Sequence, residues 1–305
     1  MDALWIFPGQ GGQYAGMLKQ VPAALRQHVE TLLDLPLLDT TAGYADSVQL
    51  QVSITLLQVA QVQMIQKMGF RPRLAAGHSL GVFAAAYALD CLALDDLFKI
   101  VKQRAELMQQ AYPVGYGMGV IVGLTRAEVT QLVAQVTTTA KPVFVSNQNA
   151  EDQVALSGHL VAIDQVLELA KAQGAAKALR LNVPVPSHSP LMHDVAEKLQ
   201  QSLAEVTFNR PHGIYLANDN GHAARQIIPV RRDLGDNLVH PVYFESMMAV
   251  ATNYAPDVII NFAPGHPFKQ VLAQKFDEQH QLYLAQFSKA DIHYLLEKWE
   301  RGSNL

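Results

Sequence analysis

Cysteine and net charge are what this sequence has least of. Its 305 residues include one cysteine, Cys91, and 23 basic against 27 acidic side chains, for a formal net charge of -4. Without a basic excess, the chain lacks the charge pattern of a protein that binds nucleic acid or a membrane surface. A lone cysteine forms no disulfide within the chain, which favours a reducing compartment. We therefore expect a cytoplasmic protein, with Cys91 in its core.

Long apolar runs are also scarce. The N-terminal run Leu4–Phe7 ends at Pro8, which makes it too short for a signal peptide, and no basic segment precedes it. We expect no stretch of the chain to span a bilayer. Hydrophobic residues nevertheless make up 50% of the chain, which is enough for a large core. The length predicts one large domain, alone or with a smaller one.

The order of apolar runs and helical repeats predicts an α/β protein with a parallel sheet. The run Leu4–Phe7 leads into a glycine-rich loop, and Arg73–Ala76 leads through Gly77 into the apolar segment Leu80–Leu89. Strand, glycine turn and buried helix in this order are typical of a parallel sheet covered by helices. Further helices are predicted over 53–68 and 94–111, and further strands over 214–217, 258–262 and 282–287.

The middle of the chain follows a different order. Between residues 118 and 186, apolar runs and a capping box at Thr125 and Glu128 predict a strand, a helix, two strands, a helix and a strand. This βαββαβ order is that of a ferredoxin-like unit. We expect a small ferredoxin-like subdomain at 118–186, inserted into a large α/β-hydrolase-like catalytic domain made of 1–117 and 187–305.

The pentapeptide Gly77-His78-Ser79-Leu80-Gly81 is the first candidate for chemistry. A G-x-S-x-G sequence between a strand and a helix predicts a nucleophile elbow, a sharp turn that exposes the serine hydroxyl. The backbone N–H of Leu80, at the start of the helix, would form half of an oxyanion hole. The alternative is a bystander serine in a glycine-rich turn, and the position between strand and helix favours the nucleophile.

A serine nucleophile needs a base, and His188 is the best placed of the 11 histidines. It lies in a proline-stiffened loop after a strand, and α/β proteins place their sites at the carboxyl ends of strands. His78 is adjacent to Ser79, where neighbouring side chains point apart. The pattern alone leaves a structural role for His188 equally open. The less favoured histidines are His159, His193, His212, His240 and His266.

Arg104 is the most informative charged residue. On the predicted helix it shares one face with Leu97, Val101 and Met108, and that face is otherwise apolar. A buried guanidinium needs a partner, because a buried unpaired charge is strongly destabilising. An internal Asp or Glu is the favoured partner from the pattern alone. The other possibility is a substrate carboxylate held by the planar guanidinium fork.

The loop Gly9-Gln10-Gly11-Gly12 could supply backbone N–H groups to the same site. It is not a P-loop, because it lacks the G-K-[ST] ending. It is not a dinucleotide-binding loop either, because no G-x-G-x-x-G precedes a helix with a correctly spaced acidic residue. A simple turn at the end of a strand is the alternative.

Six segments, taken together and in this order, resemble the malonyl-CoA:acyl carrier protein transacylase family. Each segment is short, but they extend over nearly the whole chain, and their combination is specific. They are Phe7–Gly11, Gly77–Gly81, Arg104–Met108, Val154–Gly158, Val185–His188 and Ala263–Gly265.

This resemblance implies an S-malonyltransferase that works by ping-pong acyl transfer. Ser79 would carry the malonyl group, His188 would be its general base and acid, and the amides of Gln10 and Leu80 would form the oxyanion hole. Arg104 would bind the malonyl carboxylate, which reverses the preference stated above. The partner of the base would be a main-chain carbonyl near residues 241–243. No bound cofactor is implied: malonyl-CoA would be the donor, and a phosphopantetheine-type thiol on an acyl carrier protein the acceptor.

A few positions depart from the common form of the family. Val82 stands where many members carry Glu, Tyr243 stands where Gln is frequent, and the segment 112–118 replaces the usual turn. This segment, with Phe83–Ala86 and Pro264–His266, resembles the transacylase (epsilon) subunit of malonate decarboxylase. The acceptor would then be the phosphoribosyl-dephospho-CoA thiol on the carrier subunit of that complex. The alternative is a malonyl-CoA:acyl carrier protein transacylase of fatty-acid or polyketide synthesis.

Two other classes of protein share part of this pattern. An α/β-hydrolase-type thioesterase shares the elbow, but the sequence lacks the upstream H-G-G-G-type loop of that class. A carrier-binding subunit with a dead site is disfavoured because Ser79, His188 and Arg104 occur together. Ser187 leaves the choice between malonyl and methylmalonyl open. The candidates for docking an acidic carrier surface are Arg71, Arg73, Arg180 and Lys269.

Overall fold

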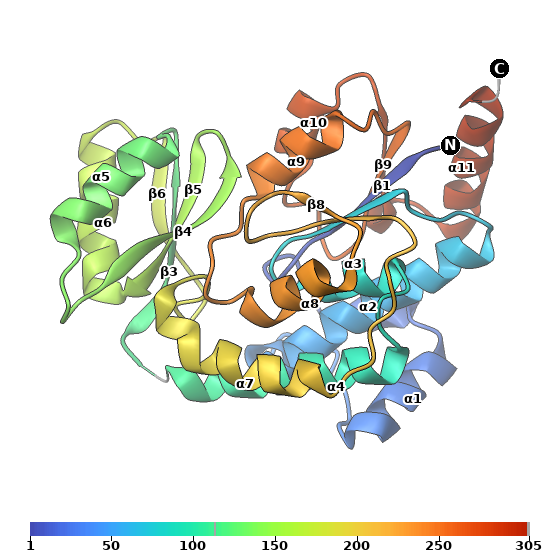
Figure 1. The fold of residues 1–305 in the computed structure, drawn as a ribbon, viewed down its shortest axis with the longest axis horizontal. Helices are drawn as coiled ribbons and strands as arrows, with labels where there is room; N and C mark the ends of the chain where they lie inside the picture. The colour runs from blue at the N-terminus through green and yellow to red at the C-terminus, as the bar shows by residue number, and fades with distance from the viewer. Residues whose placement is uncertain (113, 304–305) are drawn as a thin grey trace.

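The computed structural model describes residues 1–112 and 114–303 and contains two units, each built on its own sheet (Figure 1). Pro113, within the segment 112–118 that departs from the family, lies outside the described residues. The smaller unit, with α5 (Arg126–Val136) and α6 (Leu160–Ala172), lies beside the larger one, and the N-terminus lies on the opposite side of the larger unit.

The larger unit has a six-stranded sheet in the order β10-β9-β1-β2-β7-β8. Five of these strands are parallel, and β8 runs antiparallel to β7. This confirms the predicted α/β class with a parallel-sheet core. The expected last strand over 282–287 is wrong at both ends, because β10 ends at Tyr283 and Leu284–Gln286 turns into a 3-10 helix. The strands are β1 (Ala3–Phe7), β2 (Leu74–Gly77), β7 (Ile214–Leu216), β8 (Ala223–Ala224), β9 (Val258–Asn261) and β10 (His280–Tyr283).

The central strand β1 is buried along its whole length, because helices cover both faces of the sheet. Its side chains alternate between the faces, as a strand requires. Trp5 and Phe7 join the core formed with α2, α3 and α4, while Leu4 and Ile6 join the core formed with α9 and α10. These helices are α2 (Ser47–Lys67), α3 (Gly81–Ala88), α4 (Leu94–Ala111), α9 (Phe244–Thr252) and α10 (Lys269–Lys275).

Helix α2 contradicts the expectation that no stretch of the chain could span a bilayer. Among the described residues it is one helix that is long and apolar enough, by length and composition alone. However, 89% of the apolar window is buried inside the protein, and the helix buries polar residues such as Gln51 and Gln58 completely. We therefore interpret α2 as a core helix. It begins six residues before the predicted start, because the Asp46 carboxylate caps it by accepting the Gln49 N–H.

The smaller unit has a four-stranded antiparallel sheet in the order β4-β5-β3-β6, with two helices that share its core. Its first helix begins with the predicted capping box of Thr125 and Glu128. Backbone hydrogen bonds between Ser146, Gln148 and Val242 join this sheet to the larger unit. The elements are β3 (Tyr116–Val122), α5 (Arg126–Val136), β4 (Val143–Ala150), β5 (Gln153–His159), α6 (Leu160–Ala172) and β6 (Lys177–Leu181).

Four more α-helices in the described part of the chain belong to the larger unit (Figure 1). Helix α4 packs against α1 and α7, and α7 packs against α8. The C-terminal end of α8 is thereby brought to the carboxyl edge of the parallel strands, where the candidate site lies. These helices are α1 (Ala23–Leu33), α7 (His193–Ala204), α8 (Ile227–Asp236) and α11 (Lys289–Ser303).

Replacing Gly81 with alanine should lower the free energy of unfolding by roughly 3 kcal/mol or more. A Cβ on Gly81 would overlap the carbonyl oxygen and carbon of Phe7, in the buried strand β1. Neither backbone can give way cheaply, because both belong to the packed core. Chemical denaturation measures the change. Gly302→Ala is the control, because nothing lies within 4 Å of that position, and a similar loss in both variants would contradict the steric explanation.

Candidate active site

Ser79 lies on the turn between β2, which ends at Gly77, and α3, which begins at Gly81. Its φ is 52°, in the left-handed region that non-glycine residues rarely adopt. Such a conformation costs about 1–3 kcal/mol and persists only where the surroundings enforce it. Gly77 is required at the turn, because a Cβ there would overlap the backbone of Gly81. The predicted elbow geometry is therefore present, with the serine at its tip.

The side chain of Asn218 holds this strained turn through two hydrogen bonds to its backbone. Its Oδ1 accepts the Ser79 N–H at 3.0 Å, and its Nδ2 donates to the Gly77 carbonyl at 2.5 Å. The backbone N–H of Asn218 donates in turn to the buried carboxylate of Asp233 at 3.0 Å. Sequence analysis missed Asn218, because it lies 139 residues from Ser79 along the chain.

The imidazole of His188 lies next to the serine hydroxyl, and only 2% of the residue is exposed. The distance from Nε2 to Ser79 Oγ is 2.8 Å, so the hydroxyl can donate its proton to this nitrogen. His188 also has a positive φ, 63°. Two neighbouring residues in strained conformations, joined by a hydrogen bond, mark this place as a reaction site.

The carbonyl partner of His188 lies earlier in the chain than expected. His188 Nδ1 contacts the carbonyl oxygens of Asn237 at 2.8 Å and His240 at 3.3 Å, which lie four residues and one residue before the expected segment 241–243. Asn237 caps the C-terminus of α8, where helical carbonyls lack intrahelical partners and carry the negative end of the helix dipole. Such a carbonyl takes a hydrogen bond from Nδ1–H, which leaves Nε2 as the acceptor for Ser79.

Burial lowers the pKa of His188 from its usual 6.5 to about 3, and repulsion from the Arg104 cation, and from His78 where that ring is protonated, acts in the same direction. The two carbonyl contacts oppose this shift without cancelling it. The imidazole is therefore neutral, and able to accept a proton, throughout the neutral and mildly acidic range. This is the protonation state that a general base needs.

The acylation rate constant of Ser79 should consequently stay level as the pH falls from 8 to 5. A base with an ordinary pKa of 6.5 would lose most of its activity in that interval, whereas a base that is protonated only near pH 3 stays active. Rapid-quench measurement of kcat/KM for the first acyl transfer checks this. A tenfold loss for each pH unit below 6.5 would show that His188 titrates as an ordinary histidine.

Arg104 is buried completely on the inner face of α4. One terminal nitrogen lies 3.4 Å from Ser79 Oγ, and the other donates to Oε1 of Gln51. No Asp or Glu among residues 1–112 and 114–303 forms an ion pair with it, so the internal acidic partner considered from the pattern is not found. Burial lowers the pKa of Arg104 to about 9, which leaves the guanidinium charged at neutral pH.

Gln51 is the second residue that sequence analysis missed. It is fully buried on α2, and its Nε2 contacts Ser47 Oγ at 2.9 Å and Met108 Sδ at 3.5 Å. These contacts orient the amide so that Oε1 faces Arg104. The sequence does contain a signal for it, since polar residues recur at 51, 55 and 58, a spacing that places them on one face of the helix among apolar neighbours.

The two predicted oxyanion-hole amides come from segments that the fold brings together. Leu80 is the N-cap residue of α3, and Gln10 belongs to the loop after β1. A Cβ on Gly9 would lie 2.9 Å from the carbonyl oxygen of His78, so this loop packs directly on the elbow. No acceptor in the described part of the chain takes a hydrogen bond from either amide, which leaves both N–H groups available.

His78 points away from Ser79, as expected for adjacent residues on the elbow. Its Nε2 contacts Asn149 Oδ1 of the smaller unit at 2.9 Å, and its ring packs against Phe244 and Phe268. Burial lowers its pKa to about 4, so the ring is neutral and Nε2 is the donor. His78 therefore joins the two units beside the site and takes no proton from Ser79.

The other sequence candidates lie in ordinary contacts. Cys91 is buried in the core as expected. His193 and His212 contact the carboxylates of Glu197 and Asp90 at 3.4 and 3.2 Å. Among the docking candidates, three form ion pairs, Arg71 with Asp90, Arg73 with Asp2 and Arg180 with Asp164, and Lys269 lies over the ring of Tyr283. His159 caps α6, the ring of His266 contacts Tyr283, and His240 contributes its carbonyl to the site.

The assembled site can perform acyl transfer. It combines a hydroxyl that a neutral imidazole can deprotonate, two free amides and a buried cation. In the described part of the chain, no group of three or more His, Cys, Asp or Glu residues could hold a metal ion. The Arg104 guanidinium lies 3.4 Å from the Ser79 hydroxyl and has no carboxylate partner among the described residues. It is therefore suited to a substrate with a negative group close to the reacting carbonyl.

Comparison with known proteins identifies the family. The acyl transferase domain matches residues 4–301. The chain is 31% identical over 275 residues to the malonyl CoA-acyl carrier protein transacylase of Escherichia coli strain K12, covering 86% of this chain and 88% of that protein. FabD from Acinetobacter baumannii matches with a TM-score of 0.89 and 28% identity, over 96% of this chain and 98% of that one. A structure of a type II PKS acyl-carrier protein in complex with its malonyl-transacylase matches with a TM-score of 0.86 and 27% identity, over 92% of this chain and 95% of that one. The chain therefore belongs to the acyl transferase domain family.

Proposed function

We propose that this chain is an S-malonyltransferase. It moves a malonyl group from malonyl-CoA, through an ester on Ser79, to the thiol of an acyl carrier protein. The observation that carries the proposal is the buried guanidinium of Arg104, which lies 3.4 Å from the Ser79 hydroxyl and pairs with no carboxylate in the described residues. A malonyl thioester supplies the missing carboxylate, one methylene away from the carbonyl that Ser79 attacks.

In the first half-reaction, His188 Nε2 takes the hydroxyl proton as Ser79 Oγ attacks the thioester carbonyl. The new C–O bond forms, and the carbonyl electron pair moves to an oxyanion held by the amides of Gln10 and Leu80. The oxyanion then collapses and the C–S bond breaks. Protonated His188 returns its proton to the departing CoA thiolate, so the enzyme is left as the malonyl ester.

In the second half-reaction, the carrier thiol gives its proton to His188 and attacks the ester on Ser79. The same amides hold the second oxyanion, the C–O bond to Ser79 breaks, and Oγ recovers the proton from His188. Each oxyanion donor of this kind is typically worth about 10²–10³ in rate. No cofactor takes part in these steps.

Arg104 and Gln51 would select malonyl over acetyl groups. The guanidinium fork can hold a carboxylate through two parallel hydrogen bonds, which a compact ammonium cannot do. An acetyl group would leave the cation buried and unpaired, at a cost of several kcal/mol. The charge of Arg104, retained at neutral pH, would therefore be paired only by an acyl group that carries a free carboxylate.

The relatives favour an acyl carrier protein as the acceptor. They are named as malonyl transacylases that act with such a carrier, and one solved structure contains the carrier itself. We therefore place the transacylase of fatty-acid or polyketide synthesis first. The departures at Val82 and 112–118 favour the alternative that the carrier subunit of malonate decarboxylase is the acceptor. Cys91 is the one cysteine of the chain and is buried as a free thiol, which fits a reducing compartment. We therefore propose that the reaction takes place in the cytoplasm.

We also propose that the β3–β6 unit is a ferredoxin-like subdomain that forms one wall of the substrate cleft. The βαββαβ chain order and the four-stranded antiparallel sheet in the order β4-β5-β3-β6 support this proposal. His78, Tyr243 and the Val242 backbone join it to the larger unit beside the elbow, through contacts with Asn149, Arg126 and β4. The acyl donor and the carrier would both reach Ser79 along this junction.

An acceptor comparison tests the proposal. The enzyme is first loaded from malonyl-CoA, and the decay of the malonyl-enzyme is then followed with acyl carrier protein, with the decarboxylase carrier subunit, and with buffer alone. We expect the fastest decay with acyl carrier protein and little hydrolysis. Faster decay with the decarboxylase carrier would favour that alternative, and rapid release of free malonate in buffer alone would identify a thioesterase.

A further inference from the structure

Two glutamines of α2 make contacts that the transfer mechanism does not use. Gln58 is fully buried, and its Nε2 donates to the carbonyl oxygens of Pro8 at 2.8 Å and Ala263 at 3.1 Å. One turn further along α2, Gln61 Oε1 accepts the N–H of Ala263 at 3.0 Å. The two amides therefore hold both polar groups of Ala263, and one of them also holds Pro8.

Pro8 is the residue from which the oxyanion loop begins. The loop Gly9–Gly12 packs on the elbow at one end, since Gly9 lies against the His78 carbonyl. At its other end it packs on the turn that follows β9, since a Cβ on Gly12 would lie 2.6 Å from the Pro264 carbonyl oxygen. Gln58 ties the start of this loop to that same turn.

The burial of Gln58 has a cost that its packing does not explain. Its Oε1 is buried and accepts no hydrogen bond from any protein group in residues 1–112 and 114–303. A buried amide that is only half satisfied is less favourable than an apolar side chain of the same shape. A polar group kept under these conditions is expected to perform a task that an apolar residue cannot.

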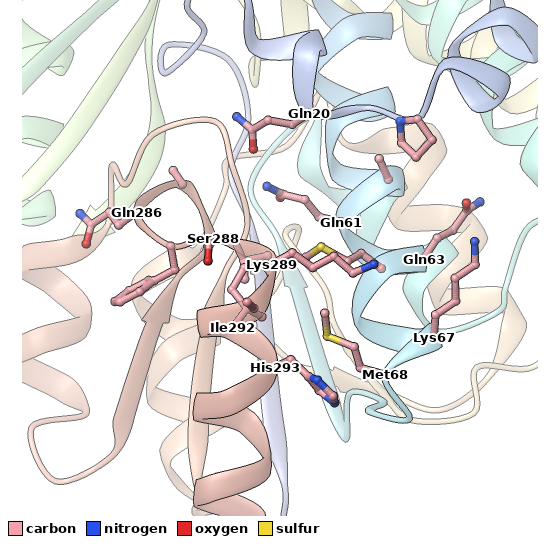
Figure 2. Close-up of a pocket in the computed structure, with 17 residues that line it drawn as sticks. Gln20, Gln61, Gln63, Lys67, Met68, Gln286, Ser288, Lys289, Ile292 and His293 are labelled. Atoms are coloured by element: carbon pink, nitrogen blue, oxygen red, sulfur yellow. The ribbon is translucent and has the colours of Figure 1, made fainter.

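The surroundings of Gln61 differ from those of Gln58. Gln61 points from α2 into a groove of about 1170 Å³ (Figure 2), which lies between α2 and the segment 284–293. Met64, Met68 and Ile292 line the groove with it. Gln61 is still only 6% exposed, so its amide is held in place and its contact with Ala263 is protected.

We propose that Gln58 and Gln61 are positioning residues that fix the Gln10 amide where the oxyanion forms. Gln58 holds the carbonyl of Pro8, two residues before Gln10, and Gln61 holds the turn that supports the far side of the loop. The precision required is high, because a displacement of about 1 Å in a catalytic group can cost roughly 10²-fold in rate. This inference rests on the acyl-transfer function proposed above.

The first test compares Gln58→Leu, Gln61→Leu and the control Gln63→Leu. Gln63 lies on the same helix, but its amide contacts the Tyr87 hydroxyl and not the loop. Single-turnover malonylation, expressed per active site, excludes any unfolded fraction. We expect a loss of about 10–100-fold for Gln58→Leu and about 3–10-fold for Gln61→Leu, each with an unchanged KM for malonyl-CoA. Gln63→Leu should match the wild type.

A double-mutant cycle separates positioning from general damage. A backbone ester at residue 10 removes the Gln10 N–H and leaves its side chain in place. If Gln58 acts through this N–H, Gln58→Leu should cost less than threefold in the ester background, whereas independent effects would multiply. If Gln58→Leu does not fold, the near-isosteric Gln58→Glu replaces it.

The outcomes distinguish this inference from the function on which it rests. An unchanged single-turnover rate in Gln58→Leu, a loss confined to KM, or losses that multiply in the cycle would overturn the positioning role. Failure of the wild type itself to become malonylated would overturn the proposed function instead. Wild-type malonylation with the expected pattern in the variants supports both.

Discussion

Replacing Arg104 with alanine should lower kcat/KM for malonyl-CoA by about 10²–10³-fold and leave that for acetyl-CoA within a few-fold. Removing one member of a buried charge pair costs about 3–5 kcal/mol, and each 1.4 kcal/mol is tenfold in rate. The loss applies only to a substrate that carries a carboxylate. Competition between the two thioesters for one enzyme sample measures the ratio directly.

Two variants provide controls for this expectation. Arg104→Lys keeps the charge and loses the planar fork, so it should retain part of the malonyl preference. Arg301→Ala removes an exposed arginine that pairs with Glu297 and should change neither rate. If Arg104→Ala still prefers malonyl-CoA to the wild-type extent, the guanidinium does not hold the malonyl carboxylate.

The same position offers a measurement of stability that does not depend on activity. Arg104→Met should raise the free energy of unfolding by about 1–3 kcal/mol, because an apolar side chain replaces a buried cation that has no internal carboxylate partner. Chemical denaturation of the unliganded protein checks this. A less stable variant would show that Arg104 contributes to folding, and that its placement needs no substrate to explain it.

Replacing His188 with alanine should lower the acylation rate of Ser79 by about 10³–10⁴-fold. In the described residues, His188 Nε2 is the nitrogen that accepts the Ser79 hydroxyl, at 2.8 Å, and the nearby guanidinium cannot act as a base. Rapid-quench kinetics with labelled malonyl-CoA measure this step without interference from the second half-reaction.

His193→Ala is the matched control for His188. This histidine is close in the chain, but its side chain is 69% exposed and pairs with Glu197. Its variant should acylate at the wild-type rate. A loss smaller than tenfold in His188→Ala would mean that another group takes the proton. The tautomer inferred from the Asn237 and His240 carbonyls would then play no part in activating Ser79.

The elements that carry local patterns could be predicted from the sequence. The helix over 94–111 has the predicted bounds, and the elbow and the capping box at Thr125 lie where they were expected. Each is specified by residues close together in the chain: glycines that permit a turn, apolar residues on one face of a helix, or a hydroxyl three residues before a glutamate. Local physics is enough for these elements.

The contacts that complete the site could not be predicted in this way. Asn218 and Asn237 lie in different elements from Ser79 and His188, and their contacts depend on how α8 docks against the sheet. The carbonyl that binds His188 was therefore placed a few residues too late, although a helix C-terminus always leaves carbonyls free. The first six residues of α2 were missed for a similar reason, because buried glutamines interrupt its apolar pattern.

The central claim is that Ser79 carries the malonyl group. Intact-protein mass spectrometry after brief incubation with malonyl-CoA, followed by peptide mapping, tests it most directly. We predict one added malonyl group, located on the peptide that contains Ser79, absent from Ser79→Ala, and removed when acyl carrier protein with a free thiol is added. A stable malonyl group on any other residue, or no covalent intermediate in an enzyme that still transfers malonyl, would contradict the account.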